Sequence, residues 1–271
     1  MQIDLPMTIM THQAKRPSLL LAALETRAVY ELWAYYVSLP FLQAAPRGDG
    51  HPVMVLPGFM ASDLSTLPLR LYLKSRGYNA YGWGMGRNYG RGIDPQNGIP
   101  PNAKTIKRIK AMYRKHGQKV SLVGWSLGGI YARELARLLP EYVRTVITLG
   151  SPFTNDERAN NVYPLFERMS GHRLEDINPE VRRRLKEHVP VPSTAVYSKS
   201  DGVVSWRCCL EQLDEYSENV EVFSSHTGLG HNPLVLWVVA DRLAQPEGEW
   251  RPFERSGLKK WLYQQEEQDT C

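Results

Sequence analysis

Residues 123–132 read VGWSLGGIYA, with Ser126 between two glycines and a third glycine close behind, where an apolar run gives way to a helical pattern. Glycine costs backbone entropy in strands and helices alike, so three glycines around one polar residue need a structural reason. Gly124, Ser126 and Gly128 match G-x-S-x-G at a strand-to-helix junction. Such a turn projects the serine hydroxyl out of a sheet and leaves no room for the flanking side chains. The stretch therefore predicts Ser126 as a nucleophile, and the lack of a following G-K-[ST] argues against a phosphate loop.

Short β-rich runs alternate with helical patterns on both sides of this motif. This alternation is typical of a mostly parallel sheet with helices on both faces, so we predict an α/β fold. The expected strands are residues 53–59, 78–83, 119–126, 143–152, 193–201 and 219–226. The expected helices are residues 63–77, 102–117, 127–140 and 232–243, with Gly117 closing the second and Asn232 and Pro233 opening the last.

Two segments depart from this rhythm and suggest the domain organisation. Residues 152–190 are polar and helical in pattern, and we predict that they form a small helical cap inserted in a main domain of residues 46–271. Residues 1–45 form a predicted N-terminal helical segment. Within it, residues 18–42 are strongly apolar but carry Glu25, Arg27 and Glu31, which are costly in hydrocarbon. We expect one amphipathic helix packed on the core, with docking to a membrane surface as the open alternative.

Composition limits the class of protein. Apolar residues make up 42% and charged residues 23% of the 271, as in ordinary soluble domains. The net charge of +5 comes from 33 basic and 28 acidic residues spread along the chain, without a nucleic-acid motif, so we expect no nucleic-acid partner. The three cysteines suggest neither a disulfide framework nor a zinc site, and residues 1–18 show no secretory signal pattern. We expect a cytoplasmic protein, with membrane association left open.

A serine nucleophile needs a histidine base that is oriented by a carboxylate. For the acid, Asp201 follows an apolar strand, and Gly202 after it permits a tight turn. Strand carboxyl ends meet at the sheet edge toward which Ser126 points, so Asp201 is the favoured acid. An Asp-Gly turn without chemistry is the plain alternative. Asp156 and Asp176, in the predicted cap, are weaker candidates.

Two histidines compete for the role of base. We expect His226 to follow its strand directly at the sheet edge, whereas His231 lies five residues further on, beside the predicted N-cap Asn232. We therefore favour His226, with His231 as the alternative base or as a rim or capping residue.

The oxyanion of an acyl-transfer intermediate needs backbone N–H donors from two places. The loop after the first buried strand, with Gly58 at its turn, offers Phe59 or Met60, and the first helical residue after the serine offers Leu127. The glycine-rich residues 81–92 lack a G-x-G-x-x-G frame, so a dinucleotide site is not expected. The predicted substrate-lining residues are Met60, Trp83, Met85 and Trp125, with an ordinary mobile loop as the alternative interpretation of residues 81–92.

With these residues in place, the chain resembles the α/β-hydrolase superfamily over about residues 50–245. The segments LPGF, GWSLGG, GSP, SDGVV and SHTGLGHNP look like the lipase and esterase branch related to lecithin:cholesterol acyltransferases and inositol deacylases. Family members commonly carry a histidine with a proline seven positions on, which here matches His226 and Pro233. Two departures are Pro57, where many relatives have histidine, and Ser225, where they have glycine.

The resemblance implies hydrolysis of a carboxylic ester through an acyl-enzyme, with Ser126, His226 and Asp201 as triad and no cofactor or metal. A small-molecule ester or a lipid is the expected substrate. An acyltransferase with the same triad, a non-catalytic binding protein on this scaffold and a membrane-associated lipid hydrolase are the alternatives. The oligomeric state is not predicted.

Overall fold

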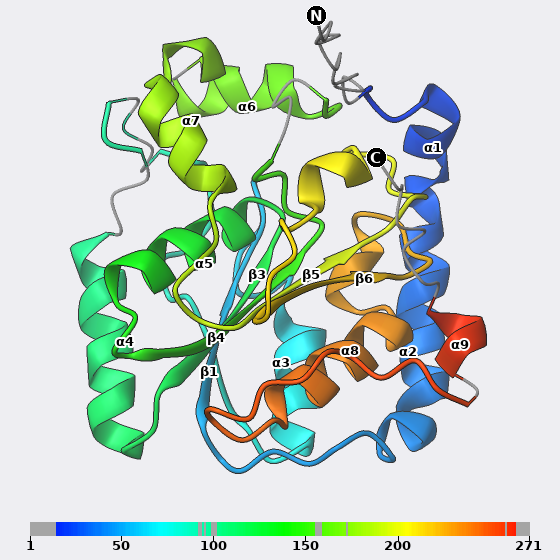
Figure 1. The fold of residues 1–271 in the computed structure, drawn as a ribbon. Coiled ribbons are helices and arrows are strands. Elements are labelled where there is room, and N and C mark those ends of the chain that lie inside the picture. Colours follow the sequence, from blue (N-terminus) through cyan, green and yellow to red (C-terminus); the bar gives the residue numbers. More distant parts are fainter. Residues whose placement is uncertain are drawn as a thin grey trace, which may run out of the picture.

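The computed structural model describes residues 15–91, 94, 96–98, 102–154, 159–171, 173–257 and 259–263 (Figure 1). Its described strands form one six-stranded sheet in the order β2-β1-β3-β4-β5-β6, and every neighbouring pair is parallel. The strands are β1 Pro52–Leu56, β2 Asn79–Gly82, β3 Val120–Trp125, β4 Val143–Leu149, β5 Ser193–Tyr197 and β6 Ser217–Glu221. The parallel sheet predicted from the alternating pattern is confirmed.

Helices cover both faces of the sheet because its strands are apolar on both sides. In β1, Val53 and Val55 pack with the helices α3 (Leu67–Ser75) and α8 (Pro233–Leu243) in one core cluster. The alternate residues, Met54 and Leu56, pack with α4 (Ala103–His116) and α5 (Leu127–Leu138) in a second cluster. The sequence thus builds a three-layer α/β architecture around two cores.

The predicted helix boundaries at Gly117 and Asn232 are found in the structure. Gly117 ends α4 in the left-handed conformation, with φ 66°, where a side chain would be strained. Asn232 caps α8, since its side chain accepts a hydrogen bond from the Leu234 N–H, and Pro233 takes the first helical position. Local sequence signals therefore set these two ends.

The N-terminal helix differs from the expected single helix over residues 18–42. The structure divides it into α1 (Leu19–Ala23), a 3₁₀ turn η1 (Leu24–Arg27) and α2 (Ala28–Leu42). The break lies where Glu25 and Arg27 turn toward loops of the main sheet and bind them. We call residues 19–42 the N-terminal arm, which Figure 1 shows in blue beside the sheet.

Two helices lie between β4 and β5, in the segment predicted as a cap. They are α6 (Tyr163–Ser170) and α7 (Pro179–Lys186), joined through a 3₁₀ turn η2 (Leu174–Asp176), and Figure 1 shows α6 and α7 together at the top of the molecule. Shorter elements complete the described fold: η3 Trp206–Cys209, η4 Gly228–Gly230 and α9 Lys259–Leu262.

Candidate active site

Ser126 lies in a strained turn between β3 and α5. Its backbone has φ 53° and ψ −123°, and Ser126 and Met60 are the residues other than glycine with positive φ in the described part of the chain. Such strain persists only where the surrounding structure holds it, and it is concentrated at functional sites. Both strained residues line the same cavity, described below.

The glycines around Ser126 are required by close packing. A Cβ on Gly128 would lie 2.3 Å from the carbonyl oxygen of Leu56 in β1, and one on Gly124 would lie 2.4 Å from the carbonyl oxygen of Gly128. Neither neighbour is a flexible side chain that could move away. The turn that presents Ser126 can therefore form only with glycine at both positions.

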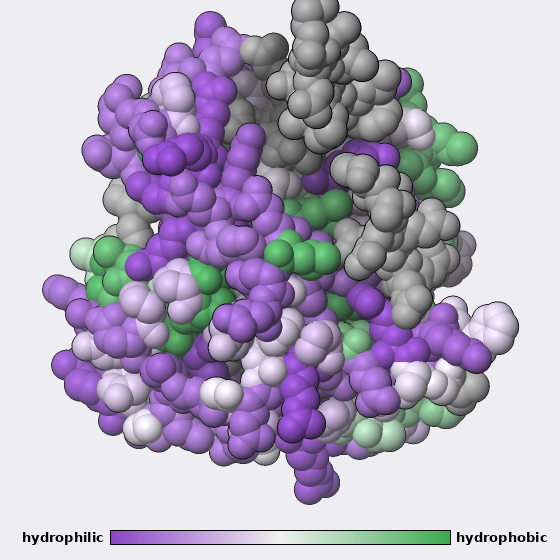
Figure 2. All heavy atoms as spheres, in the orientation of Figure 1, coloured by the Kyte–Doolittle hydropathy of each residue, from purple (hydrophilic) through white to green (hydrophobic). Residues whose placement is uncertain are grey.

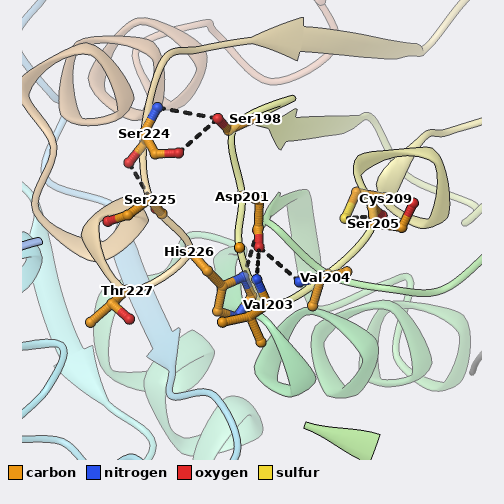
Figure 3. Close-up of polar contacts among 12 residues, drawn as sticks. Ser198, Asp201, Val203, Val204, Ser205, Cys209, Ser224, Ser225, His226 and Thr227 are labelled. Atoms are coloured by element: carbon orange, nitrogen blue, oxygen red, sulfur yellow. Dashed lines mark hydrogen bonds and ion pairs between the residues drawn. The ribbon is translucent and has the colours of Figure 1, made fainter. Parts of the chain in front are cut away.

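Asp201 and His226 form a buried pair at the carboxyl end of the sheet. His226 Nδ1 donates to Asp201 Oδ2 at 2.6 Å, while Asp201 Oδ1 accepts the N–H groups of Val203 and Val204 at 2.8 and 2.7 Å (Figure 3). These bonds fix the carboxylate, which in turn fixes the imidazole, so that in the neutral ring Nδ1 carries the proton and Nε2 can accept one. We expected His226 to follow its strand directly. The structure differs, because β6 already ends at Glu221.

Opposing effects act on the pKa of His226. Burial alone lowers this pKa, but the charge and hydrogen bond of Asp201, with a contribution from the charge of Glu25, raise it above the ordinary histidine value. A general base works in its neutral form, so we expect any activity that uses His226 as a base to rise as pH increases through this raised pKa.

His231 and Asp176 do not join this pair. His231 Nε2 lies 3.0 Å from the carbonyl oxygen of Ala28 in the arm, so its ring binds the arm and does not line the cavity. Asp176 is exposed at the end of η2, and Asp156 lies outside the described residues. The structure thus brings His226 and Asp201 together and leaves His231 and Asp176 apart from them.

Two of the backbone amides predicted as oxyanion donors, those of Leu127 and Phe59, belong to residues that line the same cavity as Ser126. Leu127 is the first residue of α5, where an N–H has no partner within the helix. The Phe59 N–H has no hydrogen-bond acceptor among the described residues, whereas the Met60 N–H donates to the carbonyl oxygen of Asn88 at 2.6 Å. Of the two predicted loop donors, Phe59 is therefore the free one.

Asn88 was not singled out in the sequence, yet it organises the loop that carries Phe59. It is buried, its Nδ2 donates to the carbonyl oxygen of Pro57 at 2.9 Å, and its backbone N–H donates to the carbonyl oxygen of Ala61 at 2.8 Å. The available signal was a polar side chain within the glycine-rich segment. Nothing in that segment alone indicated which loop it would bind.

A cavity of about 430 Å³ opens at Ser126. Ser126, Leu127 and His226 line it from the sheet side, and most of its remaining wall is apolar. The apolar lining includes Phe59, Met60, Trp125, Ile130, Tyr163, Phe166, Val181, Leu185, Val203 and Val204. A site of this size and lining suits an apolar small molecule held beside a few polar groups.

Two of the four predicted substrate-lining residues lie elsewhere. Met60 and Trp125 line the cavity, but Trp83 and Met85 do not. Trp83 packs in the core beside Met54 and Leu56, with Met85 against the same cluster, because Asp63 accepts the Trp83 N–H and draws this segment onto the sheet. The prediction that Trp83 and Met85 form a cavity wall is wrong.

A second serine, histidine and aspartate set lies at the opposite end of β3. His51 Nδ1 is 2.5 Å from Asp49 Oδ1, and His51 Nε2 is 2.8 Å from Ser121 Oγ. His51 and Ser121 are both fully buried, and burial lowers the pKa of His51. No substrate can reach the Ser121 hydroxyl, so we assign this set a role in stabilising the fold. Ser126 differs from Ser121 because it lines an open cavity.

The described residues contain no cluster of three or more histidine, cysteine, aspartate or glutamate side chains suited to a metal ion. Over the same residues, no helix has both the length and the apolar character needed to cross a membrane.

Comparison with known proteins places these observations in context. A family model described as PGAP1-like alpha/beta domain matches residues 101–228, which include Ser126, Asp201 and His226. Serine hydrolase BPHL of Mus musculus is 30% identical over 124 residues, or 43% of this chain and 41% of the relative. The Homo sapiens protein of that name is 32% identical over 123 residues, or 42% and 40%. The chain therefore spans about two fifths of the length of these curated relatives.

Solved structures of lipases share the fold at low sequence identity. The mature form of Bacillus licheniformis lipase BlEst2 has a TM-score of 0.55 at 17% identity, covering 74% of this chain and 95% of that chain. Aspergillus fumigatus lipase B has a TM-score of 0.55 at 18% identity, covering 77% and 57%. Together with the parallel sheet, these matches confirm the predicted resemblance to the lipase and esterase branch of the α/β-hydrolase superfamily.

Proposed function

We propose that this protein hydrolyses carboxylic esters of apolar acyl groups through a covalent acyl-enzyme. One observation carries the proposal: Ser126, in its strained turn, and His226, bound to Asp201, line the same apolar cavity. A serine beside a histidine whose tautomer is fixed by a carboxylate is the arrangement that nucleophilic acyl transfer requires.

In the first half of the proposed reaction, Ser126 Oγ attacks the ester carbonyl carbon while its proton passes to His226 Nε2. The carbonyl oxygen becomes an oxyanion, which the Phe59 and Leu127 N–H groups stabilise. Asp201 stabilises the imidazolium and stays ionised. When the carbonyl re-forms, the bond to the alcohol oxygen breaks, and His226 gives that oxygen the proton.

In the second half, water replaces the alcohol. The water oxygen attacks the acyl carbon while His226 takes a proton from the water. The Phe59 and Leu127 N–H groups stabilise the second oxyanion. Its collapse breaks the bond to Ser126 Oγ, which regains a proton from His226, and the free acid leaves. An alcohol in place of this water would give an acyltransferase, so product analysis with added glycerol separates the two reactions.

We further propose that α6 and α7 act as a cap that selects the acyl chain. Phe166 of α6 stacks edge to face on Phe59 at 5.3 Å between ring centroids, and Val181 and Leu185 of α7 line the cavity. These contacts support the proposal that apolar side chains of the cap surround the acyl chain of a bound ester.

Enlarging a cap side chain is expected to shorten the preferred acyl chain. Wild-type protein should turn over p-nitrophenyl octanoate with a higher kcat/KM than the acetate, because each buried methylene contributes about 0.8 kcal/mol. Leu185→Trp should lower kcat/KM for the octanoate about tenfold or more and leave the acetate within about twofold. Leu165→Trp, on an exposed position of α6 outside the cavity lining, is the matched control. Equal losses for both esters in Leu185→Trp would exclude this role for the cap.

We also propose that the N-terminal arm docks on the surface of an anionic membrane. Although α2 buries Ala28, Tyr35 and Leu42, its outer side is apolar and exposed. The exposed side chains of the arm are Leu19, Leu20, Leu24, Val29, Tyr30, Trp33, Tyr36, Val37 and Phe41. Figure 2 shows hydrophobic atoms at the upper right, at the position of α1 in Figure 1.

Composition and charge favour lipid as the occupant of this surface. Tryptophan and tyrosine suit the interface between headgroups and acyl chains. Lys15 precedes the arm, and Lys260 lies beside the exposed Trp261 in α9. The end of α9 lies near the arm, because Tyr263, which follows α9, shares a core cluster with Tyr35 of α2. These cations would meet anionic headgroups. The predicted cytoplasmic location stays a prediction.

Binding to vesicles tests the arm directly. Wild-type protein should sediment with vesicles of phosphatidylcholine and phosphatidylglycerol more strongly than with phosphatidylcholine alone. Trp33→Glu should weaken this binding about tenfold or more, since a buried aromatic contributes about 1.5–3 kcal/mol and 1.4 kcal/mol is a factor of ten. Leu213→Glu, at an exposed leucine outside the arm, should bind like wild type. If wild type does not bind vesicles but forms a dimer that Trp33→Glu dissociates, the arm's exposed surface is instead covered by a second copy of the chain.

A further inference from the structure

Three charged side chains of the N-terminal arm turn inward, away from its apolar outer side. Glu25, Arg27 and Glu31 together bind two loops of the main domain, the one after β5 and the one after β6. These loops carry Asp201 and His226, and the bonds join residues that are 173 to 202 positions apart in the sequence. The arm is therefore tied to the two loops on which the proposed triad depends.

Glu25 makes the contacts closest to the proposed chemistry. Its Oε1 accepts the N–H of Gly202 at 2.9 Å and the N–H of His226 at 2.8 Å, and its Oε2 accepts the N–H of Thr227 at 2.9 Å. Gly202 directly follows Asp201. One carboxylate thus holds the backbone on both sides of the bond between Asp201 and His226.

Arg27 and Glu31 continue this set of contacts. Arg27 Nη2 donates to the carbonyl oxygens of Ser200 and Ser224 at 2.5 and 3.0 Å, so one guanidinium joins the two loops. Glu31 accepts the Ser225 N–H at 2.8 Å and the Ser224 hydroxyl at 2.9 Å. Arg27 and Glu31 also pair with each other at 3.4 Å.

The loops have glycines where the arm approaches most closely. A Cβ on Gly202 would lie 2.2 Å from the backbone carbonyl oxygen of Leu21, and one on Gly228 would overlap the carboxylate of Glu31. Any side chain at Gly202 or Gly228 would therefore push the arm away from the loops.

We infer that the N-terminal arm is part of the active-site framework and that Glu25 is a positioning residue for His226 and Asp201. The inference rests on the proposed function and adds a residue from outside the region that carries the serine, acid and base. Glu25 touches no substrate. It acts by holding the backbone amides of Gly202, His226 and Thr227, and so fixes the distance between acid and base.

Electrostatics supports the same role. Burial would raise the pKa of Glu25, but its three backbone N–H donors and the charge of His226 outweigh burial and lower that pKa, so the side chain is ionised at neutral pH. Its negative charge contributes, after Asp201, to the raised pKa of His226. Removing the charge while keeping the shape should therefore lower the pKa of His226.

Glu25→Gln tests both consequences. The glutamine side chain carries no charge, and its amide nitrogen cannot accept an N–H as the carboxylate oxygen that it replaces does, so kcat should fall about tenfold to a hundredfold with KM within about twofold, the loss typical of slight misplacement. The acidic limb of the pH profile should move to lower pH, and NMR titration of the His226 imidazole should show the same shift without substrate. Glu249→Gln, the same change at an exposed carboxylate outside the arm, should match wild type.

Gly202→Ala provides a second and independent test, because its methyl group pushes the arm away without altering a charged residue of the arm. It should lower kcat in the same way. If both variants fold and keep the wild-type kcat, pH profile and His226 titration, the arm has no positioning role. That result would leave the proposed function intact as long as Ser126→Ala is inactive. An inactive wild-type protein would instead count against the proposed function, and the NMR titration would still test the contact.

Discussion

Ser126→Ala is expected to abolish ester hydrolysis while the protein stays folded. The substitution removes the attacking oxygen and no packing contact of importance, so kcat for p-nitrophenyl esters should fall about 10⁴-fold to 10⁶-fold, as when a triad nucleophile is lost. The melting temperature should change little. Turnover of a chain-length series by purified wild type and variant measures the effect.

Unchanged activity in Ser126→Ala would exclude Ser126 as the nucleophile. Any remaining turnover would then come from another group, and the buried Ser121 offers no accessible hydroxyl to supply it. If neither wild type nor variant turns over any ester, a binding protein on a hydrolase scaffold becomes the better account. Serine-to-alanine loss of activity therefore separates enzyme from binding module.

His226→Ala is expected to have nearly as large an effect, and His231→Ala a small one. His226 Nδ1 is held by Asp201, which leaves Nε2 to accept the serine proton, so its loss should lower kcat about 10⁴-fold or more. His231 binds the carbonyl oxygen of Ala28 instead, and its loss should cost less than about fivefold. The two variants are matched in chemical change and lie on the same segment.

The reverse ranking of these two histidines would overturn the proposed triad. Near-normal turnover in His226→Ala together with collapse in His231→Ala would mean that the loop rearranges when substrate binds. Circular dichroism and melting curves on both variants make sure that the comparison is between folded proteins.

The sheet and the serine turn were predictable because their determinants are local. The alternation of strands and helices, the left-handed Gly117 and the cap Asn232 each depend on a few neighbouring residues, and each is found as predicted. The glycines at 124 and 128 likewise follow from the geometry of one turn. In these places the periodicity and the backbone conformation carry enough information.

The contacts of the N-terminal arm could not be predicted, because they are determined by distant residues. The sequence marks Glu25, Arg27 and Glu31 as charges on an apolar segment, which argued only against a membrane span. Their partners are mostly backbone amides and carbonyls of loops far along the chain, and these groups leave no trace in residue identities. The 3₁₀ interruption that aims them inward was missed for the same reason.

The cavity wall was partly mispredicted because the composition of a segment does not show which way its side chains point. Trp83 and Met85 stood in a glycine-rich segment that could have faced the substrate, but Asp63 binds the backbone of that segment and directs Trp83 into the core. Phe166 and Leu185 line the cavity from the segment predicted as a cap, although neither residue was singled out in the sequence. Which side of a loop faces the cavity depends on tertiary contacts.

The most direct test of the central claim is identification of the residue that a fluorophosphonate probe modifies. Intact-mass analysis of the labelled wild-type protein should show a single adduct, and peptide mapping should place it on Ser126. Ser126→Ala should stay unlabelled under the same conditions, and His226→Ala should react far more slowly. An adduct on any other residue, or equal labelling of wild type and Ser126→Ala, would contradict the proposal that Ser126 is an activated nucleophile.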